Sequence, residues 1–286
     1  MDEFPKLKAV GVPKKTIAPI DVSLLSNSDR TALRMGVYYN ENIIEFEPVL
    51  SEKESISIII TAYQTQNFIE ECLNSIENQT YFINNDNYEV LLGIDACRDV
   101  LNKVLEIRYK YRNLRVFMMG KNKGTYVTTN TLLKLVKYDN ILRFDSDDIM
   151  IPQMINEIMV FSKKYDVIRM KCRDFIGEKD NRVKKYVRFA AGTVFYKRNV
   201  INMVGGYQPW ICAADSEILE RIKKCSEIGF LDKVLFSRRV HNNSLSQKEE
   251  TKLNSKIRNS YHKKINEIKR SNVVYIKKIS GRYFEI

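Results

Sequence analysis

The chain has 286 residues, 44% hydrophobic and 29% charged, a globular composition that excludes a largely disordered protein. Lys and Arg outnumber Asp and Glu by 47 to 35; this excess favours a polyanionic partner, unless it reflects biased composition alone. No apolar run approaches the roughly 18 residues of a membrane span, and the five cysteines form no CxxC pair. We therefore expect a cytoplasmic protein with no transmembrane segment and no disulfide framework.

Residues 1–54 carry scattered prolines and weak periodicity, which predicts an irregular N-terminal arm. From Ser55 onward, short apolar runs alternate with amphipathic stretches. Strands are predicted at 57–60, 89–94, 114–118 and 140–144, and helices between them at 68–76, 100–111 and 127–136. This alternation is typical of βαβ units, so we predict an α/β fold with a mostly parallel sheet flanked by helices.

The second half of the chain is less regular. We predict strands at 167–172 and 192–196, a polar loop at 177–185, and a helix that begins near Asp215. Residues 247–286 form a basic C-terminal extension with a helical apolar spacing from Leu253 to Ile268. From Ser246 to the end there are 11 Lys or Arg and four Asp or Glu, so most of the net charge of +12 lies there.

Polar side chains follow three of the predicted strands. Ala62 and Tyr63 follow the first, Asp95 the second, and Asp145 and Asp147 the fourth. Ligands of parallel sheets bind at the carboxyl ends of the strands. Two carboxylates one residue apart suit Mn²⁺ or Mg²⁺, which can bridge phosphate oxygens, although acidic clusters also occur as solvated turns or helix caps.

These motifs, together with Asn122-Lys123-Gly124, Val204-Gly205-Gly206-Tyr207 and Arg238 to Ser244, resemble family-2 glycosyltransferases of the GT-A fold over residues 55–246. The resemblance implies a GT-A Rossmann-like domain, a UDP-sugar donor and an inverting mechanism. It implies a metal held by Asp145, Asp147 and His241. The implied nucleotide-binding residues are Thr61, Ala62, Tyr63, Asp95, Lys123, Gly124, Asn130, Asp145 and Ser146.

The general base implied by the resemblance is an Asp of a Glu-Asp pair, which reads Ala214-Asp215 here. We assign the base to Asp215, with Glu217 as a competitor, because the acceptor hydroxyl needs a nearby carboxylate to take its proton. The alternative is that Asp215 caps the following helix. Thr129 stands where many relatives have Arg; Lys121, Lys123 or Arg143 are candidates to compensate for that cation.

The sequence leaves two possible roles open for each of His241 and Trp210. His241 is either a metal or diphosphate contact or an ordinary surface residue. Trp210 either stacks on a sugar or base or packs in the core. The basic extension is a solvated face, a membrane-surface helix or a nucleic-acid contact, and its Tyr261, Tyr275, Tyr283 and Phe284 suit stacking as well as packing.

We therefore expect a metal-dependent transferase that moves a sugar to a hydroxyl acceptor. One candidate acceptor is a hydroxymethylated DNA base, as in phage enzymes, which would place the protein in the host cell cytoplasm. The other is a bacterial surface polysaccharide, an anionic glycan that suits the positive charge. A sugar-phosphate nucleotidyltransferase is less favoured, because the stretch from Thr61 to Asn67 has no glycine. A non-catalytic nucleic-acid-binding protein would leave the strand-end acids unexplained.

Overall fold

The computed structural model describes residues 37–39, 55–83, 85–176, 183–242 and 244–271. Within these residues, nine strands form one mixed sheet in the order β1-β4-β3-β2-β5-β8-β7-β9-β6. The strands are β1 (Val37–Tyr39), β2 (Ile56–Ala62), β3 (Tyr88–Ile94), β4 (Leu114–Met118), β5 (Asn140–Asp145), β6 (Ile149–Met150), β7 (Val167–Ile176), β8 (Val183–Lys197) and β9 (Ile228–Val240). Five of the eight neighbouring pairs are parallel, which confirms the predicted α/β fold.

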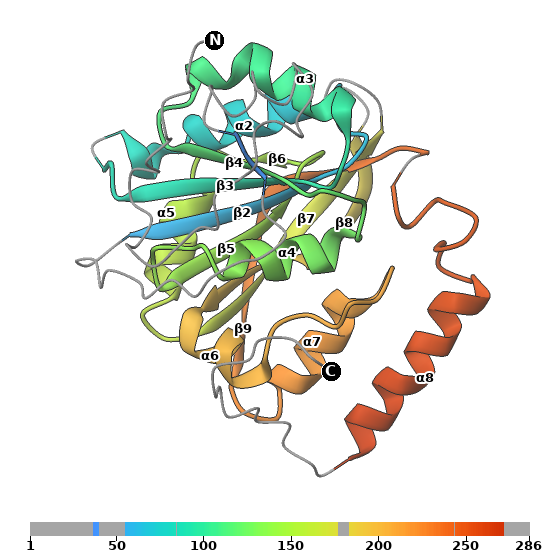
Figure 1. Cartoon of the computed structure of the whole chain (residues 1–286). Helices are drawn as coiled ribbons and strands as arrows, with labels where there is room; N and C mark the ends of the chain where they lie inside the picture. The colour runs from blue at the N-terminus through green and yellow to red at the C-terminus, as the bar shows by residue number, and fades with distance from the viewer. Residues whose placement is uncertain (1–36, 40–54, 84, 177–182, 243, 272–286) are drawn as a thin grey trace.

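Helices cover both faces of the sheet (Figure 1). On one face lie α2 (Ile69–Glu77), α3 (Arg98–Ile107) and α5 (Met154–Phe161), whose apolar sides share one core with β2, β3, β4 and β5. On the other lie α4 (Thr125–Leu133), α6 (Arg198–Val204) and α7 (Ala214–Ile222). The central strand β2 buries side chains on both faces, with Ile58 and Ile59 each 0% exposed. A strand covered on both sides therefore reads as a continuous apolar run.

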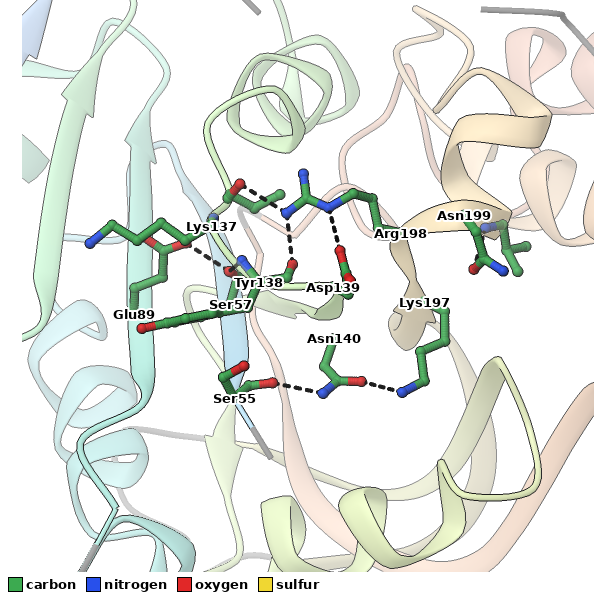
Figure 2. Close-up of polar contacts among 12 residues, drawn as sticks. Ser55, Ser57, Glu89, Lys137, Tyr138, Asp139, Asn140, Lys197, Arg198 and Asn199 are labelled. Atoms are coloured by element: carbon green, nitrogen blue, oxygen red, sulfur yellow. Dashed lines mark hydrogen bonds and ion pairs between the residues drawn. The ribbon is translucent and has the colours of Figure 1, made fainter. Parts of the chain in front are cut away.

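Polar contacts fix the strand ends opposite the predicted site (Figure 2). Ser57 Oγ donates to Glu89 Oε1 at 2.7 Å and accepts from the Tyr138 amide at 3.1 Å. Arg198 donates to Asp139 Oδ1 at 3.0 Å and to the Tyr138 carbonyl at 2.9 Å. These contacts join β2, β3, β5 and α6, so the register of the central strands is fixed at their starts.

The helix α8 (Lys256–Arg270) follows β9 and lies beside α7 (Figure 1). Its Ile265 is 3% exposed, and its Tyr261 stacks on Trp210 with ring centroids 4.3 Å apart. Trp210 therefore packs against the C-terminal helix, which matches the packing alternative rather than stacking on a sugar. Tyr275, Tyr283 and Phe284 lie outside the described residues.

Several predicted boundaries differ from the structure. The predicted arm contributes β1, which pairs in parallel with β4, and β8 already begins at Val183 inside the predicted polar loop. The helices α5 and α6 and the strands β6 and β9 were not predicted. In β9 the apolar alternation is interrupted by Asp232 and Lys233 and ends in Arg238 and Arg239, which hides the strand in the sequence.

Candidate functional site

The predicted nucleotide-binding and metal-binding residues of β2, β3 and β5 meet at one edge of the sheet. Because β2 runs parallel to both neighbours, Thr61 pairs in register with Asp145 on β5. On the other side Ala62 pairs with Ile94, and the Asp95 amide donates to the Ala62 carbonyl at 2.9 Å. The structure thus brings Thr61, Asp95 and Asp145 to neighbouring strand ends.

Asp145 lies against a buried arginine of its own strand. Arg143 is 4% exposed, and its Nη2 lies 2.9 Å from Asp145 Oδ1 and 3.2 Å from Thr125 Oγ1. Its Nη1 donates to the Gly192 carbonyl on β8. Thr125 Oγ1 is also 2.6 Å from Thr61 Oγ1, so the guanidinium links the ends of β2, β5 and α4.

The charges around Asp145 act in opposite directions on its ionisation. Burial raises the pKa of the Asp145 carboxyl, Arg143 lowers it, and the carboxylates of Asp147 and Asp215 raise it further. The charge of Asp215 on α7 thus acts on the carboxyl at the end of β5.

Asp147 meets His241 although 94 residues separate them. His241 Nε2 lies 2.8 Å from Asp147 Oδ2, and both side chains are less than a fifth exposed. Arg239 on β9 donates from Nε to the Asp147 carbonyl at 3.0 Å and packs on Phe68. The return of β9 beside β6 and β7 therefore carries His241 to the Asp145–Asp147 turn.

Asp148 is the acidic neighbour that points inward. It is 1% exposed, its Oδ1 accepts from the Arg239 amide at 2.9 Å, and its Oδ2 has no hydrogen-bond partner among the described residues. Burial, and then the charges of Asp147 and Asp145, raise the pKa of the Asp148 carboxyl well above its ordinary range. The buried Asp148 carboxylate therefore holds the turn after β5 to β9.

Asp95 holds the loop that precedes α4. Its two carboxylate oxygens accept the amides of Lys123 and Gly124, each at 2.8 Å, and the residue is 2% exposed. Gly124 has φ +86°, a left-handed conformation that favours glycine. The Lys123 side chain is exposed. The Asp95 carboxylate thus shapes the loop, and each oxygen keeps a second lone pair for another donor.

The turn after β2 is the open part of the site. Tyr63 is 41% exposed, and Lys248 Nζ lies 5.5 Å from its ring centroid and 3.5 Å from Gln64 Oε1. Ala62, by contrast, is buried. The segment after β9 therefore comes back over the turn that the sequence predicts to bind the nucleotide.

Other predicted residues make contacts within the protein. Asn130 donates to the Tyr207 carbonyl at 2.7 Å and accepts its amide at 2.8 Å, so both ends of its amide hold the Gly205–Tyr207 turn. Ser146 Oγ donates to Thr65 Oγ1 at 3.1 Å and is buried. Thr129 is 0% exposed and donates to the Thr125 carbonyl. Of the cations considered as replacements for an arginine there, Arg143 reaches the site, whereas Lys121 and Lys123 are exposed.

The two candidate bases on α7 have different surroundings. Asp215 is half-buried in the first turn, after an N-cap at Ala213, so it is not the capping residue. Its Oδ1 accepts the Ser216 amide at 2.8 Å. Glu217 is 1% exposed and receives two bonds of 2.6 Å from Arg221, which also donates to the Gly206 carbonyl. Glu217 is thus engaged in a buried ion pair and lies away from solvent, which leaves Asp215 as the available carboxylate.

The donor set suits a cation that the substrate helps to hold. Within the described residues no group of three acidic, histidine or cysteine side chains is arranged to hold a metal alone. Asp147 and His241 nevertheless offer adjacent oxygen and nitrogen ligands, with Asp145 close by in the sequence. Mg²⁺ is commonly held by one or two carboxylates together with substrate phosphates. These residues fit such a site.

Comparison with known proteins matches the region that contains these residues. A model of glycosyl transferase family 2 matches residues 57–222. The O-antigen biosynthesis glycosyltransferase WbnJ of Escherichia coli is 23% identical over 212 residues, 67% of this chain and 82% of WbnJ. The poly(ribitol-phosphate) beta-glucosyltransferase of Bacillus spizizenii is 32% identical over 114 residues, 38% of this chain. That match spans only 17% of the Bacillus protein, and a match to an uncharacterized Haemophilus influenzae glycosyltransferase spans 34% of it.

Solved structures share the fold. Residues 1–349 of Staphylococcus aureus TarS, crystallised with UDP, superpose with a TM-score of 0.55 at 20% identity, over 74% of this chain and 69% of TarS 1–349. The mannosyltransferase PcManGT of Pyrobaculum calidifontis, with GDP-Man and Mn²⁺, gives 0.56 at 15% identity, over 76% of this chain and 64% of PcManGT. Among the helices that the structure describes, none has the length and apolar character to cross a bilayer.

Proposed function

Because the chain belongs to glycosyltransferase family 2, we propose that it transfers a sugar from a UDP-sugar to a hydroxyl of a glycan acceptor, with a bound Mn²⁺ or Mg²⁺. The observation that carries this proposal is the contact between Asp147 and His241, which joins the end of β5 to the end of β9. Thr61, Asp95 and Asp145 lie at the adjacent strand ends. Ligands of parallel sheets bind outside the carboxyl ends of the strands, which is where a nucleotide diphosphate would meet a cation held by Asp147 and His241.

On this proposal the residues divide into donor and acceptor sides. Asp147 and His241 would hold the cation, and Asp145 would sit beside it. When bound, the cation neutralises charge on the departing diphosphate. Asp95 and the turn at Ala62–Tyr63 would seat the nucleotide, with the exposed ring of Tyr63 as its outer wall.

Asp215 would act as general base. The acceptor hydroxyl oxygen attacks the anomeric carbon, the bond from that carbon to the diphosphate oxygen breaks, and the hydroxyl proton passes to the Asp215 carboxylate. Direct displacement of this kind inverts the anomeric configuration. The half-buried position of Asp215 in the first turn of α7 supports this role, because the carboxylate is accessible there while Glu217 is not.

A glycan acceptor has more support than a hydroxymethylated DNA base. Two of the relatives are named for O-antigen and poly(ribitol phosphate). The basic helix α8, which motivated the DNA alternative, packs against α7, and its Tyr261 stacks on Trp210. A gel-shift titration with duplex DNA distinguishes the two acceptors: salt-sensitive binding would favour DNA, and its absence would favour the glycan.

The decisive test of the donor site is a thermal-shift titration with UDP and Mn²⁺. Wild-type protein is expected to be stabilised by the pair, because a ligand that binds only the folded state raises its stability. Asp147→Asn should lose the Mn²⁺-dependent part while unfolding at a similar temperature without ligand. The matched control is Asp232→Asn, whose exposed side chain lies on β9 away from His241. No response of the wild type to UDP and Mn²⁺ would refute the proposal.

A further inference from the structure

A cavity of about 210 Å³ lies between β7, β8, α7 and α8. Two of its lining residues, Ala191 and Ser216, are sequence neighbours of residues at the candidate site. Ala191 is next to Gly192, whose carbonyl binds Arg143, and Ser216 is next to Asp215 and binds its carboxylate. We call it the α7–α8 cavity; it adjoins the site on the side of the proposed base.

Most of the charged residues that line the α7–α8 cavity are basic. They are Arg169, Lys223 and Lys269, beside the imidazole of His262 and against a single acidic side chain, Glu220. Glu220 is already paired with Lys223 at 2.7 Å. In the part of the chain that the structure describes, no ion pair joins Arg169 or Lys269 to a carboxylate. Arg169 and Lys269 therefore bring positive charge to the cavity without an ion pair among the described residues.

Arg169 is the most buried of these cations. Its guanidinium donates to the carbonyls of Ala190 and Phe189, each at 3.1 Å, and lies 5.6 Å from the Phe230 ring centroid. Burial lowers the pKa of this arginine, and the charges of Tyr196, Asp215 and Glu220 oppose the shift only in part. Burial of a cation that has no direct ion pair is costly, and an incoming anion would offset that cost.

We propose that the α7–α8 cavity binds an anionic group of the acceptor, a phosphate or a carboxylate, and so holds the acceptor hydroxyl near Asp215. This inference rests on the proposed function and names the acceptor class for the same site. The cavity lining includes neither Asp147 nor His241, so the anion would sit apart from the donor diphosphate. In this arrangement the basic helix α8 forms the outer wall of the acceptor site.

The test is a calorimetric titration of the full chain with inorganic phosphate, in the presence of UDP and Mg²⁺ so that the donor site is occupied. Saturable binding is expected. Arg169→Gln should weaken it about tenfold, because a charge-assisted hydrogen bond contributes about that factor. Lys269→Gln, at an exposed position of the cavity lining, should weaken it less, by about threefold. The second variant keeps the test valid if the first folds poorly.

Lys263→Gln is the matched control, since it removes the same charge from the same helix at an exposed position outside the cavity lining. An equal loss in Lys263→Gln and Lys269→Gln, or no saturable phosphate binding by the wild type, would overturn the inference. Separate titrations with glycerol 3-phosphate and with galacturonate, against neutral glycerol and galactose, distinguish a phosphate source from a carboxylate source. The thermal shift with UDP and Mn²⁺ is measured on the same protein preparations, so a failure of the donor site is recognised separately from a failure of phosphate binding.

Discussion

A methyl group at Gly192 is expected to disturb the cation site while leaving the fold intact. A Cβ built at this position lies 2.9 Å from Asp145 Oδ2 and 3.2 Å from Arg143 Nη1, where ordinary contact begins at 3.4 Å. Gly192 has no positive φ, so alanine fits its backbone. The Asp145 carboxylate is the end of a side chain and must therefore turn or shift by roughly 0.5 Å, within the range that core packing accommodates by side-chain adjustment.

The expected cost falls on ligand binding. Perturbing the groups that orient a metal ligand lowers metal affinity about 10- to 100-fold, so we expect Gly192→Ala to weaken Mn²⁺ binding in the presence of UDP about tenfold. Stability should change by less than about 1 kcal/mol, because mild overpacking is offset by the lower entropy of the unfolded chain. Calorimetry with Mn²⁺ and UDP measures the first quantity, and urea unfolding measures the second.

Gly229→Ala is the matched control. The added Cβ would lie 2.6 Å from Tyr165 Cγ and 2.9 Å from Phe161 Cε1, which belong to rings packed on each other. We expect this variant to lose about 1–3 kcal/mol of stability and to keep its Mn²⁺ affinity when folded. If Gly192→Ala binds Mn²⁺ and UDP as tightly as the wild type, Asp145 does not take part in the site as described.

Three other substitutions separate structural from functional carboxylates. Glu217→Gln should destabilise the fold by about 3 kcal/mol in urea, because it leaves Arg221 as a buried charge without its partner. Asp215→Asn should instead abolish sugar transfer, followed as UDP release, with little change in stability; the reverse pattern would exchange the two assignments. Glu77 has a pKa raised above 4.5, chiefly by burial and against the hydrogen bond from Tyr88, so its native state binds the proton more tightly than the unfolded chain does. The contribution of Glu77 to the free energy of unfolding therefore falls as pH rises above 4.5. Glu77→Gln should be more stable than the wild type at pH 7. Parallel urea titrations should show that this gain disappears below pH 4.5.

The strand ends were predictable because their signal is local. In β2 and β5 an apolar run stops at polar residues, and parallel pairing then brings the ends together without further information. The position of His241 next to Asp147 was expected from the family resemblance of the segment from Arg238 to Ser244, not from local periodicity. It depends on β9 pairing with β6 and β7, which the apolar pattern of the sequence does not reveal.

The roles of buried polar groups were also beyond the sequence. Asn130 and Glu217 occupy positions where a functional role was expected, but their partners, Tyr207 and Arg221, are determined by tertiary packing. Arg143 was considered only as one of three cations that could replace an arginine at position 129. Alternate residues of β5 face the same side of the sheet, so Arg143 and Asp145 lie on one face. This alternation predicts the shared face but not the ion pair between the two side chains.

The sheet ends on both sides in very short strands among the described residues: β1 has three residues and β6 has two. Unpaired backbone groups on a long, apolar edge act as templates for other chains, so short edges limit aggregation. Removal of residues up to Tyr39 would leave β4, with Leu114, Val116 and Met118, as the edge strand of the sheet in the described part of the chain. A shortened form designed for crystallisation should therefore keep β1, since its loss would favour self-association that rises with protein concentration.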